Sequence, residues 1–300
     1  MQRLLGADVA NAAVKSRWTQ LAHGRMHHLE AGAGEPVVLL HGGTGGGANW
    51  FRQIGRLSSR CRVLAPDMPG YGMSGRAVPE LPLGRAAAHV FEDWFAANDV
   101  SRALVVGTSF GGLVALRLAV NSPGRVARLL LLDAAGLGRG IHPAVRLAAT
   151  APLARVALRP TLSGTRLQLS TLLTSDRSRL NREVQAALAA YLYETGVAAG
   201  IPYLSLTLRM FIGPNGQREV LADDELRSIR QPVSIVWGQR DRLIPVAHAH
   251  RTAGILPHAR LTIIPRAGHS PNWEAPDDVL DAIHQLADEP AGDEPAADLA

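Results

Sequence analysis

Cysteine is almost absent from this sequence, because Cys61 is the only one among 300 residues. One thiol cannot form an internal disulfide, so nothing indicates an oxidising compartment and we expect a reducing cytoplasm. The N-terminal segment has no continuous apolar stretch followed by small residues, so it is not typical of a secretory signal peptide. Long apolar runs are also missing, since residues 184–206 are interrupted by Glu194, Gly200 and Pro202. We therefore expect no transmembrane span and no stable membrane insertion.

Lysine is nearly missing as well. Lys15 is the only lysine, and arginines supply the other basic side chains of a protein with a formal charge of +5. The arginines are scattered, whereas nucleic-acid binding needs a concentrated basic face or a known module, so we expect no nucleic-acid partner. Residues 288–300 contain acidic residues and prolines but no basic residue, which predicts a disordered acidic tail.

Hydrophobic residues make up 47% of the chain, enough to bury a full core without disulfides or metals. Short leucine-rich or β-branched runs alternate with helical patterns, which is typical of an α/β protein with a mostly parallel central sheet flanked by helices. Residues 87–95 predict an amphipathic helix, and residues 110–120 predict a helix that is apolar almost all round. We expect an antiparallel strand at 26–30 and buried strands at 36–40, 62–65, 103–106, 129–132, 233–237 and 261–264.

The alternation of strands and helices stops near residue 138. Helical patterns with interspersed arginines continue from there to about residue 215. We interpret this stretch as a helical cap inserted into one α/β domain, whose core comprises residues 1–137 and 216–287. An apolar cap often contributes to dimer contacts, so a homodimer is an alternative that the sequence leaves open.

A serine stands in the sequence Gly107-Thr108-Ser109-Phe110-Gly111, between a predicted strand and a predicted helix. A sharp strand-to-helix turn strains its central residue, and glycines two residues to either side let the backbones approach. This context predicts that the Ser109 hydroxyl projects above the ends of the strands. An ordinary turn serine is the alternative, because such strings also occur by chance in chains rich in glycine.

A serine hydroxyl is a weak nucleophile that needs a histidine as base and a carboxylate to orient that histidine. Of the eleven histidines, His269 follows the last predicted strand, so it should emerge at the same sheet edge as Ser109. Asp241 follows the strand at 233–237 and emerges at that edge too. Asp133, at the end of the strand at 129–132, is its rival. We favour Asp241 as the orienting carboxylate.

Glycines are concentrated in residues 41–47, directly after the strand at 36–40. Acyl transfer needs preorganised N–H donors where negative charge develops on the carbonyl oxygen. We therefore predict an oxyanion hole made by the N–H of Phe110 and one donor from Gly43 or its neighbours. A phosphate-binding loop is the alternative use of these glycines, although no Gly-Lys-Ser/Thr sequence follows. His41 is expected to brace the loop.

These motifs resemble those of the α/β-hydrolase family from about residue 25 to residue 286. The resemblance implies that Ser109 is the nucleophile, His269 the general base and acid, and Asp241 the orienting carboxylate, with no metal and no organic cofactor. Related dehalogenases and epoxide hydrolases have an aspartate at the elbow, so Ser109 argues against both. The resemblance is carried by LLHGG at 39–43, DMPGYGMSG at 67–75, GTSFGG at 107–112, GQRD at 238–241 and GHSPNWEAPD at 268–277.

Two enzymatic functions fit this resemblance. The first is hydrolysis of carboxylic esters of small hydrophobic substrates through an acyl-enzyme. The second is carbon-carbon bond hydrolysis of vinylogous diketones, because GGANWF, the elbow and GHSPNWE are similar to the meta-cleavage-product hydrolases. Asn49 and Trp273 match substrate-contacting positions of that family, but the family usually has Asn where this chain has Thr108, which favours the ester.

Further alternatives concern the substrate and the pocket. Trp50 and Phe51, which follow the glycine-rich loop, are predicted to line the pocket entrance. Asn49, Trp50 and Trp273 are predicted to contact the substrate. Perhydrolysis, amide or lactone hydrolysis, and a ligand-binding protein of the same fold without catalysis remain open.

Overall fold

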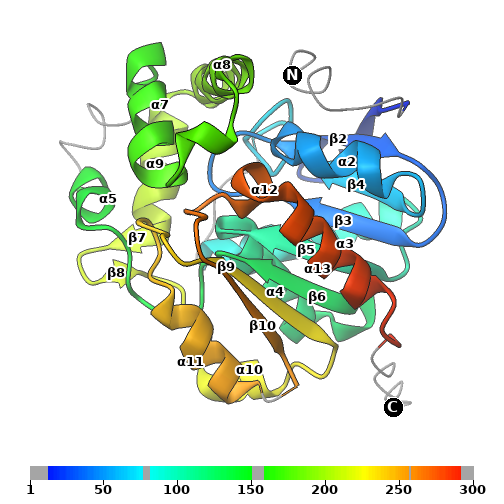
Figure 1. Ribbon diagram of the computed structural model, residues 1–300. Coiled ribbons are helices and arrows are strands. Elements are labelled where there is room, and N and C mark those ends of the chain that lie inside the picture. Colours follow the sequence, from blue (N-terminus) through cyan, green and yellow to red (C-terminus); the bar gives the residue numbers. More distant parts are fainter. Residues whose placement is uncertain (1–12, 77–81, 151–158, 257, 292–300) are drawn as a thin grey trace.

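An eight-stranded sheet forms the centre of the molecule. The structure, a computed structural model, describes residues 13–76, 82–150, 159–256 and 258–291 (Figure 1). The spatial order of the strands is β1-β2-β4-β3-β5-β6-β9-β10, in which β1 and β2 pair antiparallel, β2 and β4 pair antiparallel, and the remaining pairs are parallel. The strands are β1 (Lys15–Leu21), β2 (Gly24–Ala31), β3 (Pro36–Leu40), β4 (Arg62–Pro66), β5 (Ala103–Thr108), β6 (Val126–Leu132), β9 (Val233–Gly238) and β10 (Arg260–Ile264).

The predicted mostly parallel sheet is confirmed, and one edge strand is added to it. β1 is not predictable from its sequence, because in KSRWTQL only Thr19 and Leu21 are buried and no apolar run marks the strand. An edge strand with one solvated face carries little of the pattern that identifies central strands.

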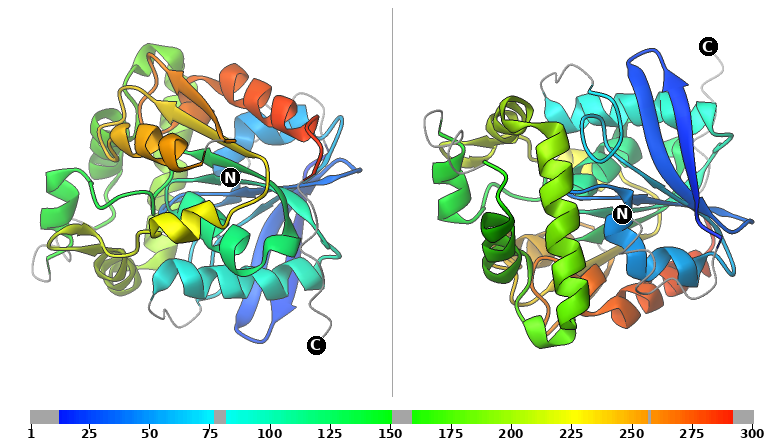
Figure 2. Two further views of the ribbon diagram at one scale, coloured as in Figure 1. Left: turned by 90° about the horizontal axis from the view of Figure 1, so that it is seen from below. Right: turned by 90° about the horizontal axis from the view of Figure 1, so that it is seen from above.

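Helices cover both faces of the sheet. Because successive side chains of a strand point to opposite faces, each strand contributes residues to both helical layers. Val38 and Leu40 of β3 join one buried cluster, whereas Val37 and Leu39 join the other. The first cluster includes side chains of α3 (Leu83–Ala97), α4 (Phe110–Asn121), α10 (Asp223–Arg227) and α11 (Ala247–Ile255). The second includes side chains of α2 (Phe51–Leu57), α12 (Pro271–Glu274) and α13 (Pro276–Ala287), and Figure 2 shows these layers on opposite sides of the sheet.

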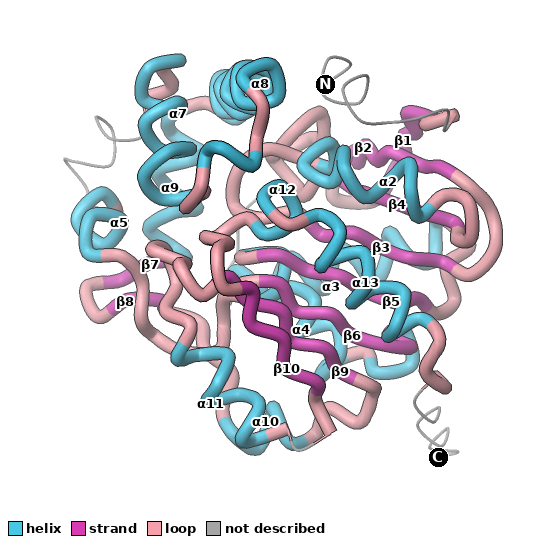
Figure 3. The backbone as a smooth tube through the Cα atoms, in the orientation of Figure 1, coloured by secondary structure: helices cyan, strands magenta, loops and turns pink. Residues whose placement is uncertain are grey.

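A group of helices stands between β6 and β9 in the chain and lies beside the carboxyl ends of the parallel strands (Figure 3). We call these helices the helical insertion. It comprises α5 (Pro143–Ala148), α7 (Leu162–Gln168), the π-helical turn η3 (Leu169–Leu173), the short turn η4 (Arg177–Arg179), α8 (Arg182–Ala199) and α9 (Ile201–Phe211), followed by a hairpin of β7 (Ile212–Gly213) and β8 (Gly216–Gln217). Residues 151–158, which fall within the stretch predicted to be helical, lie outside the described residues.

The predicted disordered tail is wrong at its first two residues. Asp288 forms an ion pair with Arg60 at 3.3 Å, and Glu289 pairs with Arg260 at 2.8 Å. The backbone carbonyl of Glu289 also accepts a hydrogen bond from Arg128 Nε at 2.6 Å. These arginines come from elements distant in sequence, so composition alone could not reveal the contacts. Residues 292–300 of the expected tail lie outside the described residues.

In the described part of the chain, no helix has both the length and the apolar character needed to cross a membrane. Most of the N-terminal segment on which the signal-peptide prediction rests, residues 1–12, lies outside the described residues.

Candidate active site

Ser109 lies at the sharp turn between β5 and α4, with φ 52° and ψ −121°. A positive φ is unfavourable for a residue with a side chain, so the surrounding backbone must hold the turn. The carbonyl of Ser109 accepts N–H groups from Gly112 and Ala135, both at 2.9 Å, and its own N–H donates to Leu132 O at 3.0 Å. The elbow therefore has the strained geometry that the motif predicts.

Glycines are required on both sides of the elbow because other backbone segments pass against it. A Cβ atom at Gly107 would collide with the carbonyl of Gly111, and one at Gly111 would collide with the carbonyls of Leu40 and His41. Any side chain at these positions would push β3, β5 and the start of α4 apart. The two glycines thus let the elbow sit tightly against the neighbouring strand.

His269 and Asp241 come from loops after β10 and β9 and form a buried pair. Nδ1 of His269 lies 2.8 Å from Oδ2 of Asp241, and their side chains are 4% and 0% exposed. Oδ1 of Asp241 accepts the N–H groups of Leu243 at 2.7 Å and Ile244 at 3.0 Å. The carboxylate is therefore held by its own loop in the orientation that meets the imidazole.

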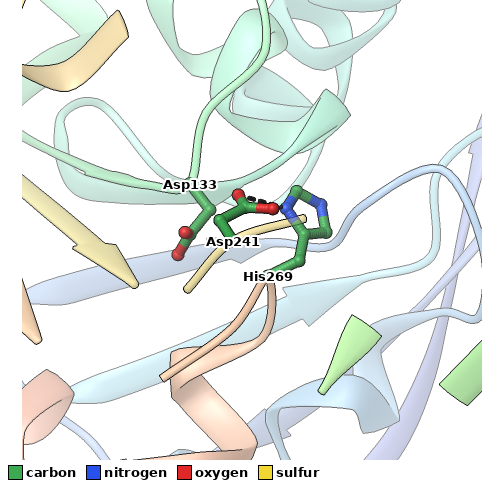
Figure 4. Close-up of side chains that lie close together, drawn as sticks. All are labelled: Asp133, Asp241 and His269. Carbon is green, nitrogen blue, oxygen red and sulfur yellow. Dashed lines mark hydrogen bonds and ion pairs between the residues drawn. The ribbon is translucent and has the colours of Figure 1, made fainter. Parts of the chain in front are cut away.

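Asp133, the rival acid, ends β6 and lies next to this pair. Figure 4 shows Asp241 between Asp133 and His269, with the marked contact running from Asp241 to the ring. One oxygen of Asp133 accepts the N–H of Gly238 at 3.0 Å. Burial, followed by the charge of Asp241, raises the pKa of Asp133 well above its usual value. Since His269 bonds to Asp241, the geometry favours Asp241 as the orienting carboxylate.

The same three side chains lie close enough together to be compared with a metal site. One ligand atom from each of Asp133, Asp241 and His269 lies within 4.8 Å of the others. However, both oxygens of Asp241 already accept hydrogen bonds, and Nδ1 of His269 faces Oδ2. A cation would have to displace these contacts, so the donor set suits a hydrogen-bonded chain better than a metal.

The glycine-rich loop passes close over the elbow. A Cβ atom added to Gly42 would lie 3.2 Å from Cβ of Ser109. Gly43 and Phe110 line the same cavity as Ser109. Within the described residues, neither of their N–H groups donates to a protein acceptor. Both residues predicted as oxyanion donors thus line the cavity that contains Ser109, with N–H groups that no described protein acceptor occupies.

His41 braces this loop, as expected. It is fully buried, its Nε2 accepts the N–H of Met68 at 2.8 Å, and Nδ1 lies 2.7 Å from the carbonyl of Gly42. Burial lowers the pKa of His41, which agrees with a neutral ring that accepts at one nitrogen and donates at the other. The ring therefore ties the loop to the end of β4.

Asp67 is a second loop anchor, for which the sequence alone predicts no role. Its carboxylate accepts the N–H of Gly47 at 2.6 Å and of Met73 at 2.7 Å, and it faces Nδ1 of His27 at 2.9 Å. These groups come from three separate segments. The available signal was its position directly after β4, at the same sheet edge as the other polar residues.

Ser109 and His269 both line a cavity of about 530 Å³, together with residues of the helical insertion. No direct hydrogen bond joins the side chains of Ser109 and His269, both of which lie in the described part of the chain. The cavity wall is largely apolar, and Arg159, which is exposed, is the only residue with a permanent charge among the described residues that line it. Apolar wall residues come from the insertion and from the core, among them Met68, Ile141, Val145, Leu172, Leu192, Leu204, Leu208 and Phe211.

Two of the three predicted substrate contacts line this cavity. Asn49 and Trp273 do so, and Trp273 Nε1 donates to the carbonyl of Asn49 at 2.8 Å. The prediction that Trp50 and Phe51 line the entrance is wrong, because both side chains are fully buried in the core cluster that includes α2 and α13 and neither lines the cavity. The 3-10 helix η1 (Gly47–Trp50) turns consecutive residues in different directions, so neighbours in sequence reach different sides.

Comparisons with known proteins agree with this architecture. The model of the alpha/beta hydrolase family matches residues 37–282. A 2-hydroxy-6-oxo-6-phenylhexa-2,4-dienoate hydrolase from Burkholderia cepacia is 30% identical over 264 residues, which are 86% of this chain and 89% of that protein. A dihydrolipoyllysine-residue acetyltransferase component of the acetoin cleaving system from Pseudomonas putida is equally similar, 30% identical over 257 residues, covering 85% of this chain and 64% of that protein.

Solved structures show the same fold. A meta-cleavage product hydrolase from Pseudomonas fluorescens IP01 has a TM-score of 0.77 and 24% identity, covering 90% of this chain and 97% of that one. A carboxylesterase from Bacillus subtilis has a TM-score of 0.76 and 22% identity, covering 95% of each chain. Proteins with different substrates therefore share this architecture.

Proposed function

Because this chain belongs to the alpha/beta hydrolase family, we propose that it is a serine hydrolase that cleaves carboxylic esters of small hydrophobic substrates. One observation carries the proposal: the elbow residue Ser109 and His269, which is hydrogen-bonded to Asp241, line a single, largely apolar cavity. A nucleophile, a base and an orienting carboxylate are the groups that acyl transfer requires.

In the first half of the proposed reaction, Ser109 Oγ attacks the ester carbonyl and His269 takes up the serine proton at Nε2. Asp241 keeps Nδ1–H directed at its carboxylate, which leaves Nε2 free to accept. The N–H groups of Gly43 and Phe110 bind the oxygen that becomes negative in the tetrahedral intermediate. Collapse of this intermediate breaks the bond to the alcohol, which leaves with the proton held by His269.

In the second half, water resolves the acyl-enzyme. His269 removes a proton from the water, which attacks the acyl carbonyl, and the same two N–H groups bind the oxygen. Breaking the bond to Ser109 Oγ returns the proton to the serine and releases the carboxylic acid. No group outside the chain is needed to balance the protons.

The lining of the cavity favours an uncharged substrate. Burying a carboxylate in an apolar cavity is unfavourable unless charged or N–H partners replace its water. Among the described lining residues, the only permanent positive charge is on exposed Arg159. An ester with an apolar acyl group fits this wall better than a dienoate does.

Carbon-carbon bond hydrolysis of a vinylogous diketone is the second candidate. It is favoured by the relative from Burkholderia cepacia and by a 2-hydroxy-6-oxononadienedioate/2-hydroxy-6-oxononatrienedioate hydrolase from Comamonas testosteroni, which is 29% identical over 86% of this chain. Asn49 and Trp273 at the cavity wall are consistent with it. The equal identity to an acetyltransferase component shows that similarity at this level does not select one substrate.

The test compares short p-nitrophenyl esters, lactones and vinylogous diketones on the wild-type protein, Ser109→Ala and the exposed control Ser101→Ala. We expect ester turnover far above diketone cleavage, and a loss of at least about 10⁴-fold in kcat for Ser109→Ala but not for Ser101→Ala. A fluorophosphonate should label wild type and Ser101→Ala only. The reverse substrate ratio would select the second candidate. Unlabelled wild-type protein without turnover would point to a binding protein.

We propose further that the helical insertion, within residues 138–215, acts as a cap over the site. Side chains of α5, α7 and α9 form the cavity wall that faces the elbow, so substrate must pass between the insertion and the core. The cytoplasmic location and the homodimer stay predictions, which fractionation and light scattering would test.

A further inference from the structure

Two carboxyl groups lie buried side by side behind His269. The side chains of Asp133 and Asp241 are both inaccessible to solvent, and an oxygen of each lies within 4.8 Å of the other. The ester mechanism uses only Asp241. Two negative charges at this separation, in side chains withdrawn from solvent, repel strongly. One of the carboxyl groups must therefore hold a proton or carry a large electrostatic cost.

The hydrogen bonds identify which group holds the proton. A carboxylate has about four lone pairs that can accept hydrogen bonds. In Asp241, the N–H groups of Leu243 and Ile244 occupy Oδ1 and the ring of His269 occupies one side of Oδ2, so a single position is left. Asp241 is therefore surrounded by donors, which stabilise its ionised form.

Asp133 has the opposite surroundings. Its Oδ1 accepts one hydrogen bond, from the N–H of Gly238 at 3.0 Å. Its Oδ2 is buried and has no partner among the described residues. The charged groups that act on it are the carboxylates of Asp241 and Glu274, which both disfavour a further negative charge. An unpartnered buried oxygen costs free energy unless it carries a hydrogen that is donated.

We propose that Asp133 keeps its carboxyl proton at neutral pH and donates a hydrogen bond from Oδ2 to the remaining position on the carboxylate of Asp241. Asp133 is then a positioning residue: it acts on the base only through Asp241, and its catalytic effect rests on the proposed function of His269. The bond would fix the plane of the Asp241 carboxylate against the ring. It would also withdraw part of the negative charge that stabilises the protonated imidazole.

Burial and the two neighbouring carboxylates raise the pKa of Asp133, which agrees with this assignment. The backbone supports it as well, since Asp133 has φ 45°, a conformation that Asp and Asn tolerate better than most residues.

The mutational test compares Asp133→Ala with Asp133→Asn. Alanine removes the donor, whereas asparagine can accept from Gly238 and donate to Asp241 from Nδ2. We expect Asp133→Ala to lower kcat by about 10- to 100-fold with KM nearly unchanged, as for other residues that orient a functional side chain. The midpoint of the acidic limb of kcat/KM should rise by about 0.5 to 1 pH unit, because Asp241 keeps more of its charge. Asp133→Asn should restore both kcat and the midpoint of the acidic limb to nearly their wild-type values.

Asp99→Ala is the matched control. Asp99 also has a positive φ, 54°, but it is exposed and far from the cavity lining. This variant should reproduce the backbone cost without changing kcat or the pH profile. The proposal is overturned if Asp133→Ala lowers only thermal stability, or if Asp133→Asn moves the acidic limb downward, which would reveal an ionised Asp133 in the wild-type protein.

Infrared spectroscopy decides the protonation state without any substrate. A difference spectrum between wild type and Asp133→Asn at pH 7 should show the C=O band of a neutral carboxyl group, shifted by ¹³C-aspartate labelling. Absence of that band overturns the proposal, even if Asp133→Ala fails to fold. A wild-type protein that shows the band but neither turnover nor labelling would refute the ester mechanism and leave the protonated Asp133 in place.

Discussion

Replacing Asp241 by asparagine changes one atom in the proposed catalytic apparatus and should nearly abolish turnover. In Asp241→Asn, Oδ1 can still accept from the N–H groups of Leu243 and Ile244, so the NH₂ group takes the place of Oδ2. It then faces Nδ1 of His269, 2.8 Å away in the wild-type protein. Two donors cannot face each other, so the ring of His269 must adopt the tautomer with its proton on Nε2. In that tautomer Nε2 has no lone pair with which to accept the proton of Ser109.

The amide cannot avoid this by rotating. The opposite orientation would direct NH₂ at the two backbone N–H groups, which would leave buried donors facing donors at more than one place. The corresponding substitution in a serine protease lowers kcat about 10⁴-fold. Asp241 and His269 are similarly withdrawn from water, so we expect the same order here. At about 1.4 kcal/mol for each tenfold change, the loss is about 5 kcal/mol of transition-state stabilisation.

The assay is steady-state hydrolysis of a short p-nitrophenyl ester, with kcat and KM determined separately. KM should stay within about threefold, because the substituted atom does not contact substrate. Asp281→Asn, on the exposed side of α13, is the matched control and should behave like the wild type. A folded Asp241→Asn variant that loses less than tenfold in kcat would refute the reasoning. If Asp133→Asn were the damaging substitution instead, Asp133 would be the acid.

Three further predictions test the packing and charge of the core. Gly111→Ala should lower the free energy of unfolding by about 1 to 3 kcal/mol, because the new methyl group collides with the backbone carbonyls of Leu40 and His41. Gly254→Ala, in open space on α11, should raise the free energy of unfolding by up to about 1 kcal/mol. Urea titration measures both variants, and equal effects would contradict the collision. Burial lowers the pKa of His28 to about 4 from 6.5, so its neutral form stabilises the fold above pH 6.5. The free energy of unfolding should therefore fall by about 3 kcal/mol as the pH falls from 6.5 towards 4. His28→Leu should flatten this part of the pH dependence, and an unchanged slope of stability against pH would show that other groups cause it. Arg117→Ala should lower the free energy of unfolding by about 3 to 5 kcal/mol, because it leaves the buried carboxylate of Glu219 without its ion-pair partner at 2.6 Å. Thermal unfolding measures the loss, and adding Glu219→Gln to the same chain should recover part of it. A loss of stability below about 1 kcal/mol would show that the ion pair is not needed.

Most of the central sheet could be predicted because its strands carry their own local signal. The runs at 36–40, 103–106 and 129–132 are apolar on both sides, as strands covered by helices on both faces must be. The elbow at Ser109 was also predictable, because strand, turn glycines and helix are consecutive in sequence. Strand β1 and the contacts of Asp288 carry no such signal, since both depend on partners elsewhere in the chain.

The sequence by itself determined the fold class and a short set of polar residues at the ends of strands, because each strand ends where its own pattern of hydrophobicity ends. Only the tertiary structure decided how those residues meet: His269 bonds to Asp241 and not to Asp133, and Trp50 is buried in the core while its neighbour Asn49 faces the cavity. The reason is physical. A hydrogen bond between loops more than twenty residues apart depends on ångström-scale placement, and the charge of a buried carboxyl group depends on neighbours that the linear order does not specify.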